Sequence, residues 1–216
     1  MRSEVFSQTE TQVPGLALQN SKMLRVGLSG EFIARQGSMV AYQGNMEFDY
    51  LGSGGVGKFL KKAMTGEGTP LMKVKGTGDV FLADLARNVH VIDLEGDSLT
   101  VNGRNVLAFD STISWDIGRV QGAGMAAGGL FNMVLTGVGR VAITTDGDPV
   151  ALVVDAPTFV DTNAVVAWSS GLQTSLKKSF KIQGLVGRGS GEAIQLEFNG
   201  QGFVLVQPSE GYTPIQ

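Results

Sequence analysis

The segment that comes closest to a catalytic motif is Gly52-Ser53-Gly54-Gly55-Val56-Gly57-Lys58-Phe59. It is close to a Walker A loop, whose backbone N–H groups hold phosphates while its lysine reaches the terminal ones. Phe59, however, stands where a Ser or Thr hydroxyl should bind Mg²⁺, although Asp93 after Val91-Ile92 could mimic the second metal-binding strand. Nucleotide hydrolases of this kind alternate strands with long helices, and the chain shows no such alternation. We therefore interpret residues 52–59 as a glycine-rich connection between strands, with nucleotide hydrolysis as the alternative that would make the protein an enzyme.

His90 is the only histidine, and it alternates with Ile92 and Leu94. This spacing predicts a half-buried strand face. A lone histidine cannot build a histidine-rich metal site, and the sequence places no nucleophile beside it. A packed or surface histidine is therefore the interpretation.

Three carboxylate pairs could bind Ca²⁺ or act as acid and base. They are Glu95/Asp97, Asp146/Asp148 and Asp155/Asp161. None has the spacing of an EF-hand, and the first two bracket glycines where Asp commonly caps turns. We therefore predict no catalytic residue, no metal site and no cofactor.

Two lysine-rich stretches carry the remaining candidate site, an interaction patch with aromatic neighbours. Its members are Lys58, Phe59, Lys61, Lys62, Lys177, Lys178, Phe180 and Lys181. Lysines beside apolar residues suit an anionic membrane surface or another anionic ligand. The alternative is that these lysines are solvated and that their stems cover neighbouring apolar surface.

Composition sets the limits on function. The chain has 216 residues, a net charge of −3 and no cysteine, which argues against nucleic-acid binding, disulfides and thiolate chemistry. The start of the sequence lacks the pattern of a signal peptide, and no stretch reaches the roughly 18 apolar residues of a spanning helix. A cytoplasmic location is the expectation.

A repeated motif organises the chain. Gly-x-Gly followed by a short β-branched and aromatic run begins at Gly76, Gly137 and Gly200, so the spacings are 61 residues (76 to 137) and 63 residues (137 to 200). An apolar pair, an alanine and an aromatic residue precede each copy, around Ala41, Ala108 and Ala167. A fixed period of this kind predicts repeated structural units.

The repeats predict three antiparallel β units at about 23–88, 89–148 and 149–207. Alternating residues predict strands such as 23–28, 46–50, 89–94 and 150–154. Turns are expected at 95–97 and 146–148, and Asn102-Gly103 predicts a β-hairpin between its flanking strands. Irregular inserts are expected at 52–64, 118–134 and 169–191. The segments 59–64 and 176–181 fit a helical turn or a β-hairpin equally well. We expect an all-β, single compact domain at 1–207 and an exposed tail at 208–216.

The closing strands GTGDVFLA, GVGRVAIT and GQGFVLVQ, together with Gly66-Glu67-Gly68 ahead of the first, resemble a known family. It is the family of the altered-inheritance-of-mitochondria protein number twenty-four. The resemblance covers about 23–207 and implies a pseudo-threefold all-β fold similar to that of the tryptophan RNA-binding attenuator protein. Its eukaryotic members are associated with mitochondrial inner-membrane organisation, and the resemblance supplies no catalytic motif.

Three hypotheses follow. The first is a non-enzymatic scaffold or interaction protein that forms homo-oligomers and binds a protein partner or an anionic membrane surface. The second is a small-molecule or anionic-ligand binding module that uses the glycine-rich inserts, since glycine lets backbone N–H groups approach a ligand closely. The third is an enzyme, which would require titratable groups around Lys58, His90 or Asp93.

Overall fold

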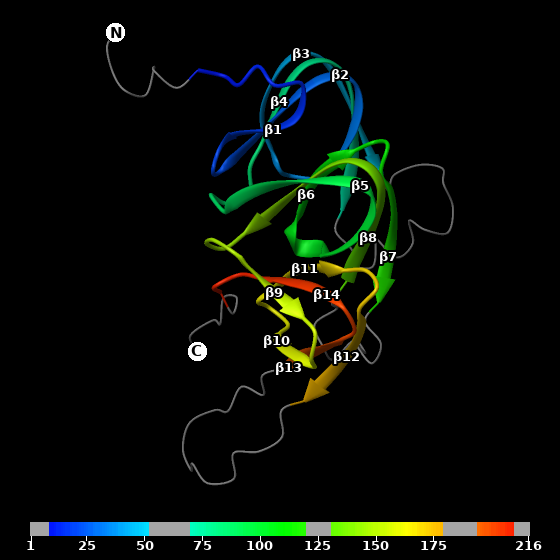
Figure 1. Cartoon of the computed structure of the whole chain (residues 1–216). Coiled ribbons are helices and arrows are strands. Elements are labelled where there is room, and N and C mark those ends of the chain that lie inside the picture. Colours follow the sequence, from blue (N-terminus) through cyan, green and yellow to red (C-terminus); the bar gives the residue numbers. More distant parts are fainter. Residues whose placement is uncertain (1–8, 52–69, 120–130, 179–193, 210–216) are drawn as a thin grey trace. The chain divides into compact units, whose positions relative to one another are not determined.

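The computed structural model of the chain describes residues 9–51, 70–119, 131–178 and 194–209. Within these ranges the chain is built of antiparallel strands and contains no α-helix, so the predicted all-β class is confirmed (Figure 1). The strands are β1 (Gly15–Asn20), β2 (Met23–Arg35), β3 (Met39–Leu51), β4 (Leu71–Leu82), β5 (Asn88–Asn102), β6 (Val106–Asp110), β7 (Ser114–Arg119), β8 (Phe131–Thr145), β9 (Val150–Val154), β10 (Thr158–Asp161), β11 (Val165–Ser169), β12 (Gln173–Lys178), β13 (Ile194–Asn199) and β14 (Gly202–Val206).

The structure differs from the predicted turns at two positions. Residues 95–97 lie inside the continuous strand β5, where Gly96 adopts a φ of 103°, so the turn predicted there is wrong. At Asn102-Gly103 the prediction of a hairpin is wrong. A 3-10 turn, η2 (Gly103–Asn105), follows β5, and the two flanking strands pair with other strands. Asn102 is buried here and donates from Nδ2 to the carbonyl of Val165 at 3.2 Å, so its side chain is used in packing.

The third insert is more regular than expected. Gln173–Lys178 forms β12, which pairs with β13, and this settles 176–178 as strand. The segment 59–64 and most of the second insert lie outside the described residues.

The chain divides into two compact units, each considered by itself. The first takes Met1–Asp97, Asn105–Ser114 and Gly137–Thr145, and the second takes Ser98–Arg104, Trp115–Thr136 and Asp146–Gln216. Strands β5 and β8 therefore contribute residues to both units. The boundaries of a domain at 1–207 and a tail at 208–216 stay predictions.

In the first unit the strands follow the order β3-β4-β2-β6-β8-β5, and β1 pairs with β2 (Figure 1). The strand predicted at 23–28 is the first part of β2, and its alternating residues Leu24, Val26 and Leu28 are all buried in the core. Full burial of each such side chain contributes about 1.5–3 kcal/mol. Arg140 of β8 holds the beginning of β1, because its Nη1 donates to the carbonyls of Pro14 and Leu16 at 3.1 and 3.0 Å.

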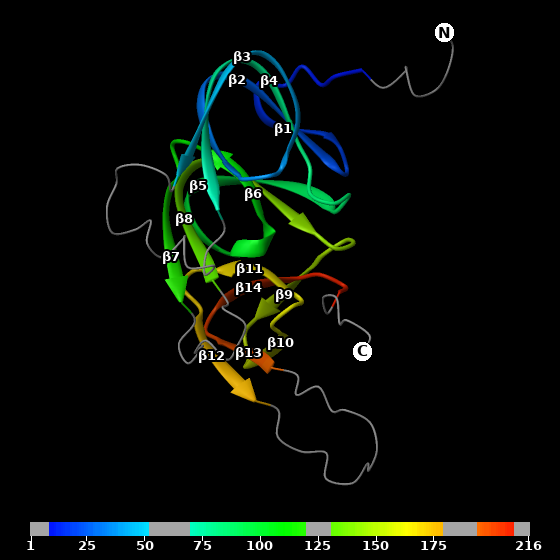
Figure 2. The ribbon, with the colours of Figure 1, turned by 180° about the vertical axis from the view of Figure 1, so that it is seen from behind.

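In the second unit the end of β5 is followed by β11, β14 and β9, while β10, β13 and β12 form a three-stranded sheet (Figure 2). Trp168 of β11 meets Phe198 of β13 edge to face, with ring centroids 5.5 Å apart. Both rings are buried, so they join the two sheets of this unit in one core.

The three repeated motifs are also alike in their pairing. Each closing strand pairs with the Ala-aromatic strand of its own repeat, with Ala41 opposite Phe81, Ala108 opposite Ala142 and Ala167 opposite Leu205. In all three pairs the register shifts by one residue just before the alanine. Because the same bulge occurs at the same place in each pair, the three sequence repeats form the same local structure. A pseudo-threefold arrangement of the whole repeats stays a prediction.

Glycine in the first Gly-x-Gly segment is required by the approach of two backbones. Gly76 and Gly78 have φ of 143° and 135°, and an ideal Cβ on either would stand 2.0 Å from a carbonyl oxygen of β3. Gly30 of β2 has a similar φ of 140° but nothing within 4 Å. Backbone strain and steric overlap can therefore be separated within the same three strands.

We expect Gly78→Ala to lower the free energy of unfolding by about 3 kcal/mol, because it combines a φ that L-residues rarely adopt with a clash against the Gln43 carbonyl. Gly30→Ala adds only the strain and should lose roughly 1–2 kcal/mol. Urea denaturation of both variants measures the difference. Equal losses would show that the backbone approach at Gly78 is not the constraint.

Candidate functional site

Most of the lysine-rich patch lies outside the described residues, as does the Walker-like segment 52–59. Lys58, Phe59, Lys61, Lys62, Phe180 and Lys181 all fall in this part of the chain. Lys177 lies on β12, where its Nζ is 3.2 Å from Glu197 Oε2 on β13. Hydrogen bonds from Ser175 and then Lys177 hold the pKa of Glu197 below its usual value. Lys178 ends the same strand.

His90 lies on β5 and is half-buried, as its spacing predicts. Its Nε2 is 2.9 Å from Thr145 Oγ1 on β8. Such a distance would suit a base and a nucleophile, but Thr145 is fully buried, so a substrate has no path to its hydroxyl. Asp93, the other candidate on β5, is exposed and accepts from Arg140 Nε at 3.3 Å. These residues are therefore parts of the framework.

The carboxylate pairs do not converge on a metal site. Within the described ranges, no group of three or more His, Cys, Asp or Glu side chains could hold an ion. Asp161 caps a turn instead, since its Oδ1 accepts from the backbone N–H of Asn163 at 2.7 Å. Asp commonly caps turns in this way, a role that the sequence indicates only for the two pairs that bracket glycines.

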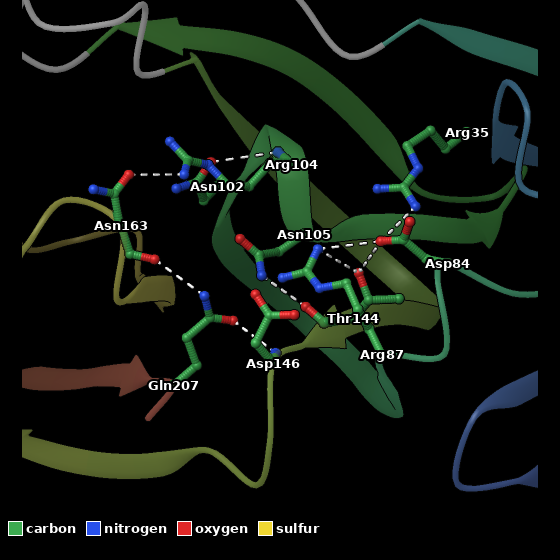
Figure 3. A network of polar contacts seen from close by, with 10 residues as sticks. All are labelled: Arg35, Asp84, Arg87, Asn102, Arg104, Asn105, Thr144, Asp146, Asn163 and Gln207. Carbon is green, nitrogen blue, oxygen red and sulfur yellow. Dashed lines mark hydrogen bonds and ion pairs between the residues drawn. The ribbon is translucent and has the colours of Figure 1, made fainter. Parts of the chain in front are cut away.

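The densest polar group of the first unit surrounds Asp84, and we call it the Asp84 cluster (Figure 3). Asp84 Oδ2 lies 2.7 Å from Arg35 Nη2 and 3.1 Å from Arg87 Nη1. The hydroxyl of Thr144 donates to the same carboxylate oxygen at 3.1 Å. Burial by itself would raise the pKa of Asp84, but the hydrogen bonds and charge of Arg35, followed by the hydrogen bonds of Arg87 and Thr144, hold it below its usual value of 3.8.

The Asp84 cluster holds an unusual turn between β4 and β5. Leu85 and Ala86 have φ of 47° and 58°, and the Arg87 N–H donates to the Asp84 carbonyl at 2.8 Å to close the turn. Two consecutive residues in this left-handed region are ordinarily Asn and Gly. Each non-glycine residue there costs roughly 1–2 kcal/mol. The Leu85 side chain is 94% exposed, so it makes no packing contribution that would offset this strain.

The second unit has a comparable polar anchor at Gln207 (Figure 3). Its side chain accepts from the Asp146 N–H at 3.0 Å and donates to the Asn163 carbonyl at 3.1 Å, while its own N–H donates to Ala164. Asn163 is held in turn by Arg104 Nη1 at 2.9 Å. These bonds hold the turn before β9 and the turn between β10 and β11, so they have a structural role.

The two strands at the ends of the strand order, β3 and β9, expose apolar side chains. In the first unit β3 is the last strand, and none of its 13 residues is buried. In the second unit β9 is the last strand, and four of its five residues are exposed, Val153 at 76%. Phe203 of β14, directly opposite Val153, is also exposed. Natural sheet edges are usually protected by charges, prolines or covering elements, so exposed apolar edges indicate interaction surfaces.

The strand predicted at 150–154 is confirmed as β9, whereas its place at the edge of a sheet is not among the sequence predictions. The available signal was its bracketing, because Asp148-Pro149 precedes the strand and Asp155 and Pro157 follow it. Charges and prolines in these positions are typical of edge strands. The strained turn at Leu85 had no signal, because neither leucine nor alanine is a turn-former.

Comparisons with known proteins agree with the resemblance in the closing strands. The family model for Mitochondrial biogenesis AIM24 matches residues 16–209. An uncharacterized protein of Streptococcus pyogenes serotype M6 is 28% identical over 194 residues, which cover 82% of this chain and 77% of that protein. A crystal structure of a Streptococcus pyogenes protein superposes with a TM-score of 0.68 at 21% identity, covering 90% of this chain and 92% of that one. At that identity the structural likeness shows the fold alone.

Likeness to the tryptophan RNA-binding attenuator protein stays a prediction.

Within the described residues, no helix is long and apolar enough to cross a bilayer.

Asp84→Asn should lower the free energy of unfolding at pH 7 by about 3 kcal/mol, since it removes the negative charge that two partly buried guanidinium groups share. Because the pKa of Asp84 is depressed on folding, its contribution is present above pH 3.8 and is lost as pH falls through the folded pKa. The difference in urea midpoint between wild type and variant should therefore be smaller at pH 3 than at pH 7. The control is Asp49→Asn, which removes the partner of an exposed lysine at 3.1 Å and should leave the midpoint unchanged.

The double variant L85N/A86G should be more stable than wild type by roughly 1 kcal/mol, because Asn and Gly suit the two positive φ values. Thermal melts of the double variant and of each single variant measure this gain. An unchanged or lower melting temperature would mean that the turn carries no strain.

Proposed function

The chain belongs to the mitochondrial biogenesis AIM24 family, and from that premise we propose that it is a non-enzymatic scaffold protein. It acts by binding protein surfaces, among them further copies of itself. The relative that the comparison identifies is uncharacterized, so the family supplies the fold and the structure supplies the surface.

The observation that carries this proposal is the pair of exposed apolar sheet edges. An edge strand presents unpaired backbone N–H and C=O groups that can accept another strand. On β3 the stretch 39–46 holds no charge, and Val40 and Tyr42 are both exposed. On β9 the residues Val150, Leu152 and Val153 are likewise apolar and exposed.

The polar groups of the described residues support a non-enzymatic role. The Asp84 cluster, the His90–Thr145 pair and the Gln207 anchor each hold a strand end or a turn. Charged and hydroxyl groups that hold strand ends and turns stabilise the framework of the fold, and these are the roles of the candidate catalytic groups His90 and Thr145.

We also propose that the protein lies in the cytoplasm and binds peripherally to an anionic membrane. Its support is the sequence pattern of the lysine-rich patch, of which Lys177 is already engaged by Glu197. Binding through the glycine-rich inserts stays the alternative that the sequence left open.

We expect native mass spectrometry of the protein, purified gently from its own host, to show a homo-oligomer or a complex with another protein. The same preparation sedimented with phosphatidylglycerol vesicles, and with phosphatidylcholine vesicles as the control, tests the membrane part. A chain that stays monomeric at micromolar concentrations and carries no partner would contradict the scaffold function.

A further inference from the structure

We propose that β9 is a self-association edge, at which Val150–Val154 of one copy pairs antiparallel with the same strand of a second copy. The two-fold axis passes through Leu152. This inference rests on the proposed scaffold function and names the surface and the partner for it.

The position of β9 makes the pairing geometrically simple. The strand closes the order β11-β14-β9 and pairs with β14 along all five of its residues, from Gly202↔Val154 to Val206↔Val150. Its opposite edge therefore faces away from β14 and can accept a strand. A second copy of β9 added there would continue the sheet as β14-β9-β9-β14 across two copies.

The register follows from the hydrogen-bonding rule of antiparallel sheets. Residues that face each other must both point their N–H and C=O groups toward the partner or both away from it. A two-fold axis between identical strands must therefore pass through a residue and not between two residues. Of the residues in β9, only Leu152 as the centre lets all five residues pair, with Val150 opposite Val154 and Ala151 opposite Val153.

Charge selects this antiparallel arrangement over a parallel one. Residues 149–154 carry no charge, and the nearest acids are Asp148 and Asp155. In an in-register parallel pair, each acid would face its own copy, and like charges directly opposite are destabilising. About Leu152, Asp148 faces Ala156 and Asp155 faces Pro149, so no like charges meet.

The other exposed edge is a poorer match for β9. Strand β3 carries Glu47 and Asp49 in its second half. Strand β9 is bracketed by acids and offers no cation to balance them. A second β9, uncharged along its paired length, suits the edge better.

The side chains also fit. On the face that carries Val153 and Phe203, the register of β9 with β14 places Phe203 beside Val153 and Leu205 beside Ala151. Joining two copies at Leu152 would set Val153 of one copy next to Ala151 of the other. Two apolar rows, Phe203-Val153-Ala151-Leu205, would then run across the joined sheet in opposite directions and shield the exposed valine.

Single cysteines test the register directly, because the chain has none of its own. Facing residues of an antiparallel pair have Cα atoms about 4.5–5.5 Å apart, a separation that a disulfide spans. Mild oxidation with copper phenanthroline should cross-link L152C into a dimer. V150C, which would face position 154 of the second copy, should stay monomeric, as should V138C, at an exposed valine of β8.

A charge exchange tests the same contact without cross-linking. A151K and V153E should each raise the dimer dissociation constant about tenfold, since each places a charge against an apolar neighbour. The double variant A151K/V153E should restore it to near the wild-type value, because each lysine would face a glutamate of the second copy. Sedimentation velocity measures the constants, thermal melts confirm folding, and V138K controls for added charge.

The outcomes separate this inference from the proposed function. A wild-type chain that is monomeric and without protein partners would overturn both. An oligomer that A151K and V153E leave intact, or in which L152C does not cross-link, would overturn the β9 contact and leave the scaffold function standing. Weakening by V138K equal to that by A151K, or no rescue in the double variant, would also overturn the contact.

Discussion

The close approach of the β3 and β4 backbones is the constraint on which the first unit depends. Gly44 and Gly78 face each other, and an ideal Cβ on Gly44 would stand 2.3 Å from the Thr77 carbonyl oxygen. On the other side β4 pairs with β2, where Gly30 lies opposite Gly76. A run of glycines thus crosses three adjacent strands, and between β3 and β4 the backbone alone excludes side chains, whereas Gly30 on β2 has open space beside it. In the later repeats the neighbours are mostly softer, such as the Thr112 and Asp110 side chains at Gly139.

The sequence predicted most of the fold, because its signals were local and periodic. Alternation placed β2 and β9, and the repeated motif identified the strands that pair within each repeat. The errors came where tertiary contacts override local preference. Gly96 lies inside a strand, although Glu95-Gly96-Asp97 favours a turn. Asn102 donates a buried hydrogen bond to the Val165 carbonyl, a distant partner that no local sequence pattern predicts.

The candidate site was harder to predict, because an edge is a property of topology. The five residues of β9 have the same composition as a central strand, and only the order of the strands shows that, among the described residues, one side of β9 is unpaired. The flanking Asp148, Pro149 and Asp155 hint at it. By contrast, the lysine-rich patch drew attention through charge, yet the Nζ of Lys177 is matched by a carboxylate on the neighbouring strand. The turn at Leu85 likewise depends on the distant Arg35 and Thr144, which no neighbouring residue signals.

The division of the chain has a consequence for its synthesis. The first unit needs residues as late as Thr145, whereas the second already includes Ser98. The first unit therefore cannot close until Thr145 has left the ribosome, by which point the earlier segments of the second unit have also emerged. An early strand such as β3 is exposed long before β8 is available. Contacts between residues so far apart in sequence form slowly and leave strand edges open to wrong partners meanwhile. The nascent chain should therefore rely on chaperone binding or slow translation more than a protein of this size with consecutive domains would.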